Sequence, residues 1–591
     1  MAVVRGEQWT LTWAPQFRDN GVGLSGVEYS DSVVNEAWLV NVPGIFAGAN
    51  LPDPTFDFNK HWAYGDLSNR NYYIAYKSKA AFGGGIGDVL LLNGASMRLP
   101  FGPCATTLPV SGTLGSSTVD EAVTMGDVEV HLAAVADFAA TDIVCIGAAV
   151  PASSIPPSAV CEYGIVLSVG GDSITLYPHI EFSGVSGVLS PGGTITGVSG
   201  ATLTVLWATG REAHGTVGGT PPFVVGEALS GTGGWTAICS RPNTGCRFSH
   251  AVGTRVVEVT DAAEDGALLC GNMSVSVSEA GDWASGNYMC IGYGSPYAEV
   301  RVITLTGPSA AFSQPLSYDH GHFGGLCKVD AAGGIYTHML CETREIPPIQ
   351  IAADYTDVDG AASLMRRYAG VKCNRGSYRA AEGDMLRMGI DDMIARTLRY
   401  RDLDASAASP WYSSNIKKVT HNFPTTEPYY FSYGALTFGG STIARIREFS
   451  LEVNNGLDPK YYVADSWDAG LVPYEIREGK REYRCAINVD VDPNERNLFA
   501  DLCRMGTYTG SYKGFQIVLV LTRGANDTIT ITLPPAVNEG SAIPGVGGDV
   551  QGCLIKNAPH AILEQPLVSV PLDIEVRSVG IVIKDNVLYY P

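Results

Sequence analysis

Basic residues and long apolar runs are scarce in this sequence. Of its 591 residues, 39 are Lys or Arg and 60 are Asp or Glu, so the formal net charge is −21. An acidic surface does not neutralise phosphates or release their counterions, which disfavours sequence-specific binding of nucleic acid. It is compatible with a surface along which DNA slides without sticking. The longest strongly apolar run, residues 517–522, is far too short to cross a bilayer, so we expect no membrane partner.

The N-terminal residues contain no segment that combines basic charge with an apolar run, which argues against export through a signal peptide. Cysteine is present 13 times, an odd number, and no two cysteines form a CxxC pair. A disulfide framework is therefore disfavoured. We expect most of the cysteines to be small buried apolar residues in a protein that folds in a reducing cytoplasm.

Catalytic and nucleotide-binding motifs are also missing. The sequence has no Gly-x-Ser-x-Gly pentapeptide and no Gly-rich loop that ends in Gly-Lys-Ser/Thr. The segment FGGGIGD (Phe82–Asp88) approaches a dinucleotide-binding loop, but it lacks the third glycine and no helix follows it. We predict a flexible hairpin loop there. We expect no catalytic residue, no enzymatic activity and no cofactor.

One group of residues has side chains of the type that bind zinc. His320 and His322 are two residues apart, beside Asp319, and two imidazoles with a carboxylate can hold Zn²⁺. A third and fourth ligand are not identified, however. The alternative is that these residues form the closing loop of a repeated module, whose other copy has no histidine at residues 180–187. We favour the loop.

A second group resembles a calcium-binding loop. Asp490, Asp492, Asn494 and Glu495 have suitable oxygen ligands, but the glycine that such loops require is absent. An N-cap role for Asp492 explains the pattern better, since Pro493 and Glu495 then complete a helix start. We therefore predict a helix over Asp492–Gly506 and no metal site. A second helix is predicted near Met385–Leu398.

Glycine, Thr, Val, Ser and Tyr are abundant, with 69 glycines, while long runs rich in Ala, Leu, Glu and Lys are scarce. This balance predicts a mainly β protein with many turns. The length suggests about three to four domains. Residues 88–99 read as a strand with Asn93-Gly94 as a hairpin turn. Other segments with strand patterning are 69–78, 445–454, 481–491, 515–523, 527–534 and 567–578.

One module occurs twice. Residues 136–147 (ADFAATDIVCIG) and 281–292 (GDWASGNYMCIG) share an Asp-aromatic-Ala triplet and a Cys-Ile-Gly triplet at one offset. In each copy an alternating strand precedes them, and a strand opened by Glu162 or Glu299 follows. The copies lie near 126–190 and 271–330. Their composition and strand pattern are typical of small antiparallel β-barrels or sandwiches. Residues 221–238, between the two copies, are predicted to form two further strands.

The composition divides the chain into residues 1–103, 104–340, 341–408 and 409–591. Basic residues nearly vanish in the second part, which holds the repeated modules, and ordinary charge balance returns after it. Residues 345–391 and 444–492 both have the pattern of a strand, a loop, a turn that contains glycine and a basic residue, and then a long strand. We interpret this as a possible internal duplication of one β-domain.

The last part resembles a known family. GALTFGGSTIARIREFSLEVNNGLDPKYYV, GKREYRCAINVDVD with the predicted helix, and FQIVLVLTRGANDTITITLP are similar, in that order, to tail tube proteins of long-tailed bacteriophages and related tailed viruses. IPPIQIAADY and RRYAGVKCNRGSYRAAEGDMLRMGID resemble the preceding segment of that family. The resemblance covers about residues 341–591 and, more weakly, 1–103. It rests on pattern and order rather than on a short motif.

The resemblance implies an antiparallel β-sandwich or barrel with a flanking helix, either single or duplicated in this chain, that carries inserted small β-barrel or sandwich modules. It implies a structural virion protein, assembled in the host cytoplasm into stacked rings whose lumen conducts DNA during ejection. The rings are hexameric, or trimeric with pseudo-sixfold symmetry if the domain is duplicated. The partners implied are further copies of the chain and the tail terminator, tape measure and distal tail proteins. A tail without a sheath follows by analogy only.

Residues 104–340 depart from the family pattern, because a small tube domain does not need them. We expect them to be displayed outside the tube, where long insertions are tolerated. Two other hypotheses about the function stay open. A secreted or surface β-repeat adhesin or S-layer-like protein accounts for the Gly/Thr-rich modules but requires an export signal. A glycan-active enzyme with accessory β-modules requires a pair of carboxylates in a cleft.

Overall fold

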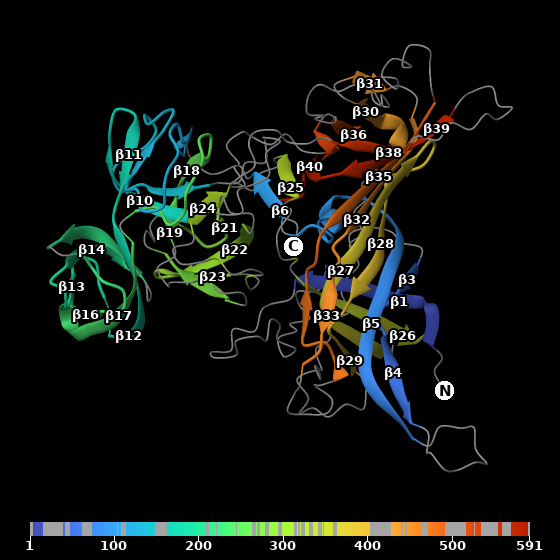
Figure 1. The fold of residues 1–591 in the computed structure, drawn as a ribbon, viewed down its shortest axis with the longest axis horizontal. Helices are drawn as coiled ribbons and strands as arrows, with labels where there is room; N and C mark the ends of the chain where they lie inside the picture. Colours follow the sequence, from blue (N-terminus) through green and yellow to red (C-terminus); the bar gives the residue numbers. More distant parts are fainter. Residues whose placement is uncertain are drawn as a thin grey trace.

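The protein is mainly β, as predicted, and all of its described strand pairs are antiparallel. A computed structural model describes residues 4–15, 40–41, 48–61, 74–102, 104–107, 114–147, 162–187, 189–208, 212–219, 222–243, 245–262, 268, 272–277, 283–293, 298–312, 316, 320, 325–329, 335–340, 346, 348–357, 363–401, 427–438, 441–443, 446–462, 471–490, 516–524, 526–533, 553–557 and 569–588. Figure 1 shows two lobes, a sandwich and a group of smaller modules, that meet near β6 and β25. Within these ranges no helix has the length and apolarity needed to cross a membrane.

The sandwich lobe contains a large sheet with the strand order β2-β1-β26-β27-β32-β35-β39-β38. The strands β28, β29, β3, β4 and β5 are attached beside this path. The bounds of its strands are β1 (Val4–Pro15), β2 (Val40–Asn41), β3 (Gly48–Asn50), β4 (Pro54–His61), β5 (Ile74–Leu90), β26 (Ile349–Asp357), β27 (Ser363–Ala381), β28 (Arg387–Ile394), β29 (Thr397–Arg401), β32 (Ile446–Asn454), β35 (Glu482–Asp490), β38 (Leu554–Asn557) and β39 (Ser569–Val576).

A second sheet, with the order β31-β30-β36-β37-β40-β25-β6, packs against the first. Its strands are β6 (Cys104–Thr107), β25 (Tyr336–Leu340), β30 (Gly434–Phe438), β31 (Ser441–Ile443), β36 (Ile517–Gly524), β37 (Asp527–Leu533) and β40 (Gly580–Asp585). A small hairpin, β33 (Asp458–Lys460) with β34 (Glu475–Arg477), lies beside the large sheet near β27 (Figure 1), to which Lys372 connects it by a hydrogen bond to the Ile476 carbonyl oxygen. Alternate residues of both sheets point into one shared hydrophobic core, which is why their sequences alternate with period two.

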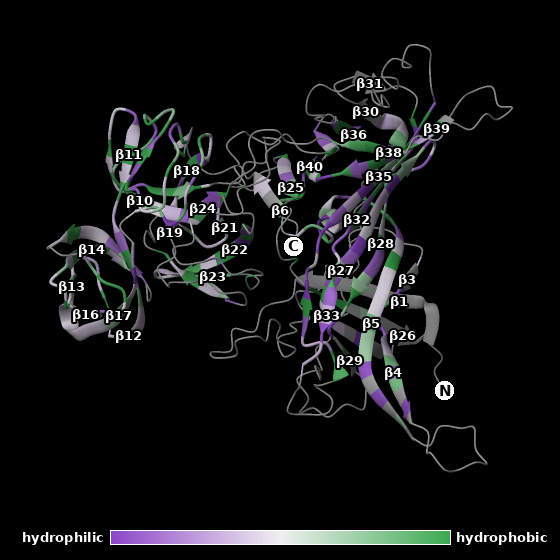
Figure 2. Cartoon of the chain, viewed as in Figure 1, coloured by the Kyte–Doolittle hydropathy of each residue, from purple (hydrophilic) through white to green (hydrophobic). Residues whose placement is uncertain are grey.

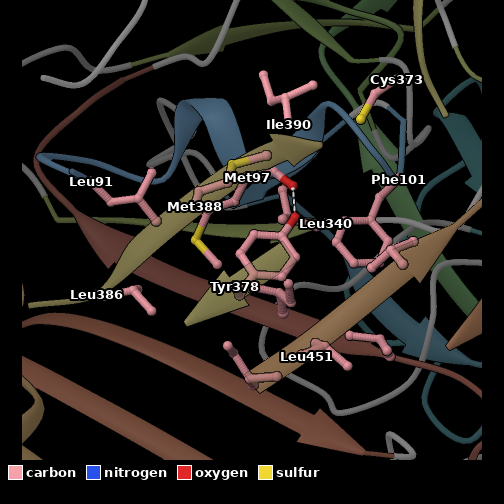
Figure 3. Packing of buried hydrophobic residues seen from close by; sticks show 14 of the residues in the cluster. Leu91, Met97, Phe101, Leu340, Cys373, Tyr378, Leu386, Met388, Ile390 and Leu451 are labelled. Atoms are coloured by element: carbon pink, nitrogen blue, oxygen red, sulfur yellow. Dashed lines mark hydrogen bonds between the residues drawn. The ribbon is translucent and has the colours of Figure 1, made fainter. Parts of the chain in front are cut away.

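Strand β27 is the longest strand of the sandwich lobe and pairs with four other strands. Its first half pairs with β26 and β29, and its second half pairs with β28 and β32. Tyr378 in the second half is fully buried, stacks on Phe101 at 6.1 Å between ring centroids, and donates its hydroxyl to the Met97 carbonyl oxygen at 2.7 Å. Figure 3 shows this hydrogen bond among the surrounding apolar side chains. A buried phenol is thereby satisfied within the core.

The module lobe contains three units. The first has the strand order β7-β18-β9-β10-β11-β8 and the second has the order β19-β24-β21-β22-β23-β20. The third is a closed barrel, β12-β15-β14-β13-β16-β17. The bounds are β7 (Ser116–Thr118), β8 (Glu129–His131), β9 (Ile143–Ile146), β10 (Glu162–Val169), β11 (Ser173–Leu176), β12 (His179–Ser186), β13 (Thr194–Gly197), β14 (Thr202–Ala208), β15 (Glu212–Gly218), β16 (Ala228–Gly231), β17 (Trp235–Asn243), β18 (Arg255–Val259), β19 (Asp261–Ala262), β20 (Ser274–Ser276), β21 (Tyr288–Ile291), β22 (Glu299–Thr306), β23 (Ser309–Phe312) and β24 (Gly325–Val329).

The first two units have the same topology, strand for strand, as the sequence repeat indicates. The barrel lies between β11 and β18, so it interrupts the first unit, whereas residues 313–324 alone connect β23 to β24 in the second. Residues 179–186, which the repeat places in the first copy, are strand β12 of the barrel. The strand that completes the first copy, β18, comes after the barrel. The two strands expected in residues 221–238 are β16 and β17, on either side of a one-turn 3-10 helix, Thr232–Gly234.

The predicted flexible loop at Phe82–Asp88 is wrong, because these residues lie in the middle of β5. They pair with β28 on one side and with β3 on the other. A Cβ on Gly84 would lie 2.3 Å from the Asn50 carbonyl oxygen, and one on Gly85 would lie 2.5 Å from the Ile390 carbonyl oxygen. The glycines therefore allow three strands to approach closely, which is a packing role and not a loop role.

Two further local predictions are wrong. Residues 385–398 are strands rather than a helix, because β28 fits between β27 and β5 and alternate residues such as Met388 and Ile390 are buried. The Asn93-Gly94 hairpin is absent as well. The Asn93 side chain accepts the Ala95 backbone N–H at 3.0 Å, and a 3-10 helix, Ala95–Arg98, follows. The helix predicted at residues 492–506 lies outside the described residues.

Candidate assembly surfaces

The strands at the centre of the large sheet present one apolar face and one polar face. Leu451, Cys485 and Ile574 lie opposite one another on β32, β35 and β39, and all three are buried in the core. The next row, Glu452, Arg484 and Glu575, points the other way. Since side chains alternate along a strand, the outer face of this region is a polar surface of mixed charge. We call it the polar face.

A bidentate ion pair orders part of the polar face. Arg484 donates from Nε and Nη2 to the two carboxylate oxygens of Asp573, at 2.9 Å and 3.0 Å. This pair lowers the pKa of the Asp573 carboxyl, chiefly through the hydrogen bonds from Arg484. Arg484 is 63% exposed, so the pair contributes little to stability and mainly fixes where the two charges lie. Glu448 and Glu575, both exposed, add negative charge to the same face.

Other features of the sandwich lobe are suited to contacts with further chains. In the described part of the sheets, β2 and β38 end the large sheet, and β31 and β6 end the second sheet. Edge strands expose backbone N–H and C=O groups that can pair with another chain. The β4–β5 hairpin extends away from the body in Figure 1. It carries Phe58, which is 53% exposed, and Lys77, whose ammonium lies 4.1 Å from the ring centroid of Phe56.

A buried Glu–His pair occurs at the same place in both modules. Glu162 at the start of β10 lies 2.7 Å from His250 Nε2, and Glu299 at the start of β22 lies 2.9 Å from His320 Nε2. The histidines occupy equivalent isolated bridges, to Val123 and Leu268. The sequence repeat finds the glutamates but misses His250, because the barrel separates that histidine from the rest of its copy. The pair joins the closing segment of each module to its sheet.

The repeated Cys-Ile-Gly triplet has three separate structural roles. Ile146 and Ile291 point into the cores of their own modules. Cys145 and Cys290 point into an apolar cluster that both modules share, so the two copies pack on each other through equivalent strands. The glycines that follow have positive φ values, +90° at Gly147 and +70° at Gly292. A Cβ on Gly292 would also lie 2.4 Å from the His320 ring. The triplet therefore belongs to the scaffold.

The barrel is attached to the first module by a buried polar cluster around Arg247. The backbone N–H of Arg247 donates to Glu162 at 2.5 Å. The Arg247 guanidinium binds Glu212 through Nη2 and donates from Nε to His179 Nε2 at 3.1 Å. Glu212 also lies 3.3 Å from His214. Burial opposes the charged form of Glu212, but the hydrogen bond from His214 and the charges of His214 and Arg247 lower its pKa to about 2. We call this set of residues the junction cluster.

The metal-ligand predictions fall partly outside the described residues, which exclude Asp319, His322, Asp492, Asn494 and Glu495. His320 is bonded to Glu299, as above, and Asp490 accepts a hydrogen bond from Arg447 Nε at 2.7 Å. Within the described ranges, no three His, Cys, Asp or Glu side chains come together in a way that could hold a metal ion. Nine cysteines are described, and all are buried free thiols, as expected for them. Burial raises the pKa of Cys246 to about 12.

The comparison with protein families identifies the family of the chain. The model of a family described as phage tail tube protein matches residues 242–573, which is more than half of the chain. The chain belongs to the phage tail tube protein family. The resemblance noted in the sequence is thereby confirmed. No curated protein matches the chain.

Membership in the tail tube family makes this chain a structural protein of the virion tail, one of many subunits that build a tube. The match begins at the end of β17 and includes the second module, β25 and most of the sandwich lobe. The first module up to its final strand, and nearly all of the barrel, precede the matched range. Sequence reasoning assigned no catalytic, cofactor or metal residue to this tail tube protein, and the surfaces above are its candidate functional parts.

Proposed function

We propose that this tail tube protein polymerises into stacked rings, and that the channel through these rings conducts DNA into the host cell. The observation that supports this most directly is the large sheet, which is apolar toward the core and polar on its other face. Sheets of neighbouring chains joined at β38 and β2 would form one continuous wall. The polar face would then line the channel.

The charges of that face suit a conduit. Glu448, Glu452 and Glu575 are interspersed with Arg379 and Arg484 on neighbouring strands. The net charge of the whole chain is −21. DNA phosphates are repelled by an acidic wall, and the few arginines are too sparse to hold the polymer by counterion release. DNA would slide through such a channel without stable binding.

The tube domain in this proposal consists of residues 1–103, 341–408 and 409–591, and residues 104–340 form an insertion outside the tube. Strands β6 and β25 narrow the insertion at both ends, because they are neighbouring strands of the second sheet in which Cys104 pairs with Leu340 and Thr107 pairs with Thr337. The insertion therefore leaves and re-enters the second sheet at neighbouring positions. On this basis the insertion runs from about residue 108 to about residue 335, since β6 and β25 themselves belong to the sandwich.

The number of chains in each ring depends on whether the tube domain is duplicated. Strands β26 and β27 form one antiparallel pair, β32 and β35 form another, and β27 pairs with β32. If these neighbouring pairs are copies of one unit, three chains complete a pseudo-sixfold ring. If they are not, six chains are needed. Tail terminator, tape measure and distal tail proteins would be the other partners. The protein would have no enzymatic activity and would assemble in the host cytoplasm, and the tube would have no sheath.

Electron microscopy of the purified protein and of virions tests this proposal. We expect stacked rings around a central channel, with three or six chains per ring according to the duplication. A protein that stays monomeric at all concentrations and is absent from virions would refute the proposal. A ring of six chains would leave the duplication unneeded and the conduit intact.

Charge reversal tests the lining of the channel. Glu448→Lys with Glu575→Lys places two cations on the polar face, and we expect tubes of normal length from which DNA is ejected more slowly. The matched control is Asp172→Lys, because Asp172 is 79% exposed and lies in the first module, outside the tube domain. Ejection at the wild-type rate in the double variant would show that this face does not line the channel.

A further inference from the structure

The outer surface of the barrel, residues 179–243, is unusually poor in charge for this acidic chain. The barrel has five charged residues, Glu181, Arg211, Glu212, Glu227 and Arg241, with a net charge of −1. Glu181 pairs in register with both Glu212 and Arg241, at the mouth that adjoins the junction cluster. Glu227 accepts the backbone N–H groups of Val224 and Ser199, at 2.6 Å and 2.9 Å. The described walls away from that mouth present no other charged side chain.

Exposed apolar side chains concentrate on this barrel. Seven of the fifteen large exposed hydrophobic residues in the described part of the chain belong to it. Five of them lie on the side formed by β12, β13, β16 and β17: Val185, Val198, Val224, Val225 and Ile238. Val198 is 81% exposed, which is costly unless another surface covers it. We call this side the apolar wall, and Figure 2 shows where its strands β12, β13, β16 and β17 lie in the barrel.

The apolar wall contains a groove of about 380 Å³. Small residues line it, including Gly184, Gly197, Ala228 and Ala237, with Val198 and Ile238 at its side. Small side chains let another backbone or an aliphatic side chain approach closely. Thr196, Ser230 and Thr236 add hydroxyl groups to the lining, which contains neither a charge nor an aromatic ring, so the groove suits an uncharged protein surface of aliphatic and hydroxyl side chains.

The opposite side of the barrel provides such a surface. In the closed order β12-β15-β14-β13-β16-β17, strand β14 lies across the barrel from β17. Its outward residues include Thr204, which is exposed, and Leu206, which is 39% exposed. Thr216 on the neighbouring β15 is exposed as well. We call this side the threonine wall. Apart from the buried Glu212 at the start of β15, the described residues of these two strands include no charged side chain.

We propose that the apolar wall of each barrel docks on the threonine wall of the barrel of a neighbouring copy in the assembled tube. Contacts between neighbours in a ring or a helical stack are heterologous, so each subunit needs two different patches, and this barrel has them on opposite sides. Copies with a charge of −21 repel one another, and uncharged walls are where their outer parts can meet. Tethering on one tube raises the effective concentration of neighbouring barrels.

Crosslinking of assembled tubes tests this inference, which rests on the proposed function. We expect the double variant Val198→Cys with Leu206→Cys to give ladders of crosslinked chains with a short bismaleimide. Each single variant should give none above the wild-type background. The nine described native cysteines are buried, which limits that background. Crosslinks in Val198→Cys alone would indicate a symmetric contact and overturn the proposal.

A second variant tests the contact without new cysteines. Val198→Asp with Ile238→Asp puts charge on the apolar wall, and we expect protease cleavage within the barrel of assembled tubes to rise at least about fivefold. Ser168→Asp, on the exposed side of β10 in the first module, is the matched control and should leave cleavage unchanged. Assembled tubes of the double cysteine variant that give no ladders, including tubes whose barrels bind host glycan instead, would overturn this inference alone. Absence of tubes in every preparation would overturn the proposed function together with it.

Discussion

Replacing Arg247 with methionine should loosen the attachment of the barrel to the first module. Methionine keeps most of the length and apolar surface of the arginine stem but removes the charge. Glu212, which is fully buried, would lose the guanidinium that binds one of its carboxylate oxygens and would keep His214, 3.3 Å away. A buried carboxylate without its partner is strongly unfavourable, so the variant should be destabilised at the junction cluster.

The size of the effect follows from the pKa of Glu212. A fall from the ordinary value of 4.5 to about 2 corresponds to about 3 kcal/mol of stabilisation of the charged form. His214 and Arg247 share this stabilisation, but removal of Arg247 also leaves the desolvation of Glu212 uncompensated. Removing one partner of a buried pair typically costs about 3–5 kcal/mol. We expect about 3 kcal/mol at neutral pH.

The difference between wild type and variant should depend on pH. In the wild type the lowered pKa of Glu212 contributes stability that is fully present above about 4.5 and is lost as the pH falls toward about 2. In Arg247→Met the pKa of Glu212 rises, so protonation relieves the buried charge at higher pH. The cost of the substitution should therefore shrink between pH 7 and pH 4. Adding Glu212→Gln to the variant should recover part of the loss at pH 7.

Hydrogen exchange with mass spectrometry measures this locally, which suits a multidomain protein whose unfolding is not two-state. Peptides from β14 and β15 should exchange about 100-fold faster in Arg247→Met, as about 3 kcal/mol requires. Peptides from β36 and β37 in the sandwich lobe serve as the internal control and should not change. Exchange of the barrel peptides within about threefold of wild type would refute the reasoning, as would equal acceleration in both lobes.

Three further predictions concern single residues. Gly84→Ala should destabilise the sandwich lobe by at least about 2 kcal/mol, because its Cβ would meet backbone at 2.3 Å, whereas Gly83→Ala has open space and should cost less than about 0.5 kcal/mol by thermal unfolding. Tyr378→Phe removes the hydrogen bond to the Met97 carbonyl and should cost about 1–2 kcal/mol, with native spectra retained; no loss in denaturant titration would contradict it. Burial lowers the pKa of His179, and nearby positive charge lowers it further. As the pH falls below about 6.5, the unfolded barrel therefore takes up a proton at His179 that the folded barrel does not. Barrel exchange should therefore accelerate between pH 7.5 and 5.5 beyond the intrinsic effect of pH, and His179→Gln should weaken that dependence.

The strands of the sandwich lobe could be predicted from the sequence because their side chains alternate between a core and a solvent face. Residues 445–454 and 481–491 carry this pattern, and they form β32 and β35 almost to the residue. The charge composition disfavours a surface for sequence-specific binding of nucleic acid, and this prediction needs no fold because charges can be counted from the sequence. The candidate polar face was not predictable, because its rows come from strands that are far apart in sequence.

Where local pattern and tertiary pairing disagree, pairing decides. Residues 82–88 look like a loop because four of the seven are glycine, but β28 and β3 hold them as a strand whose glycines allow close approach. Met385–Leu398 has the spacing of a helix, yet two flanking strands impose an extended backbone. A backbone buried in a sheet must satisfy its hydrogen bonds there, and this requirement outweighs local propensity.

The sequence by itself determined the β class, the acidic charge, the tail tube family and the presence of two copies of one module. These properties depend on residue type and spacing, which the chain carries in any conformation. Only the tertiary structure decided that the barrel interrupts the first copy, that His250 corresponds to His320, and that Cys145 and Cys290 lie where the two copies pack together. Such relations depend on which distant strands pair, and strand pairing is set by how the whole chain buries its apolar faces.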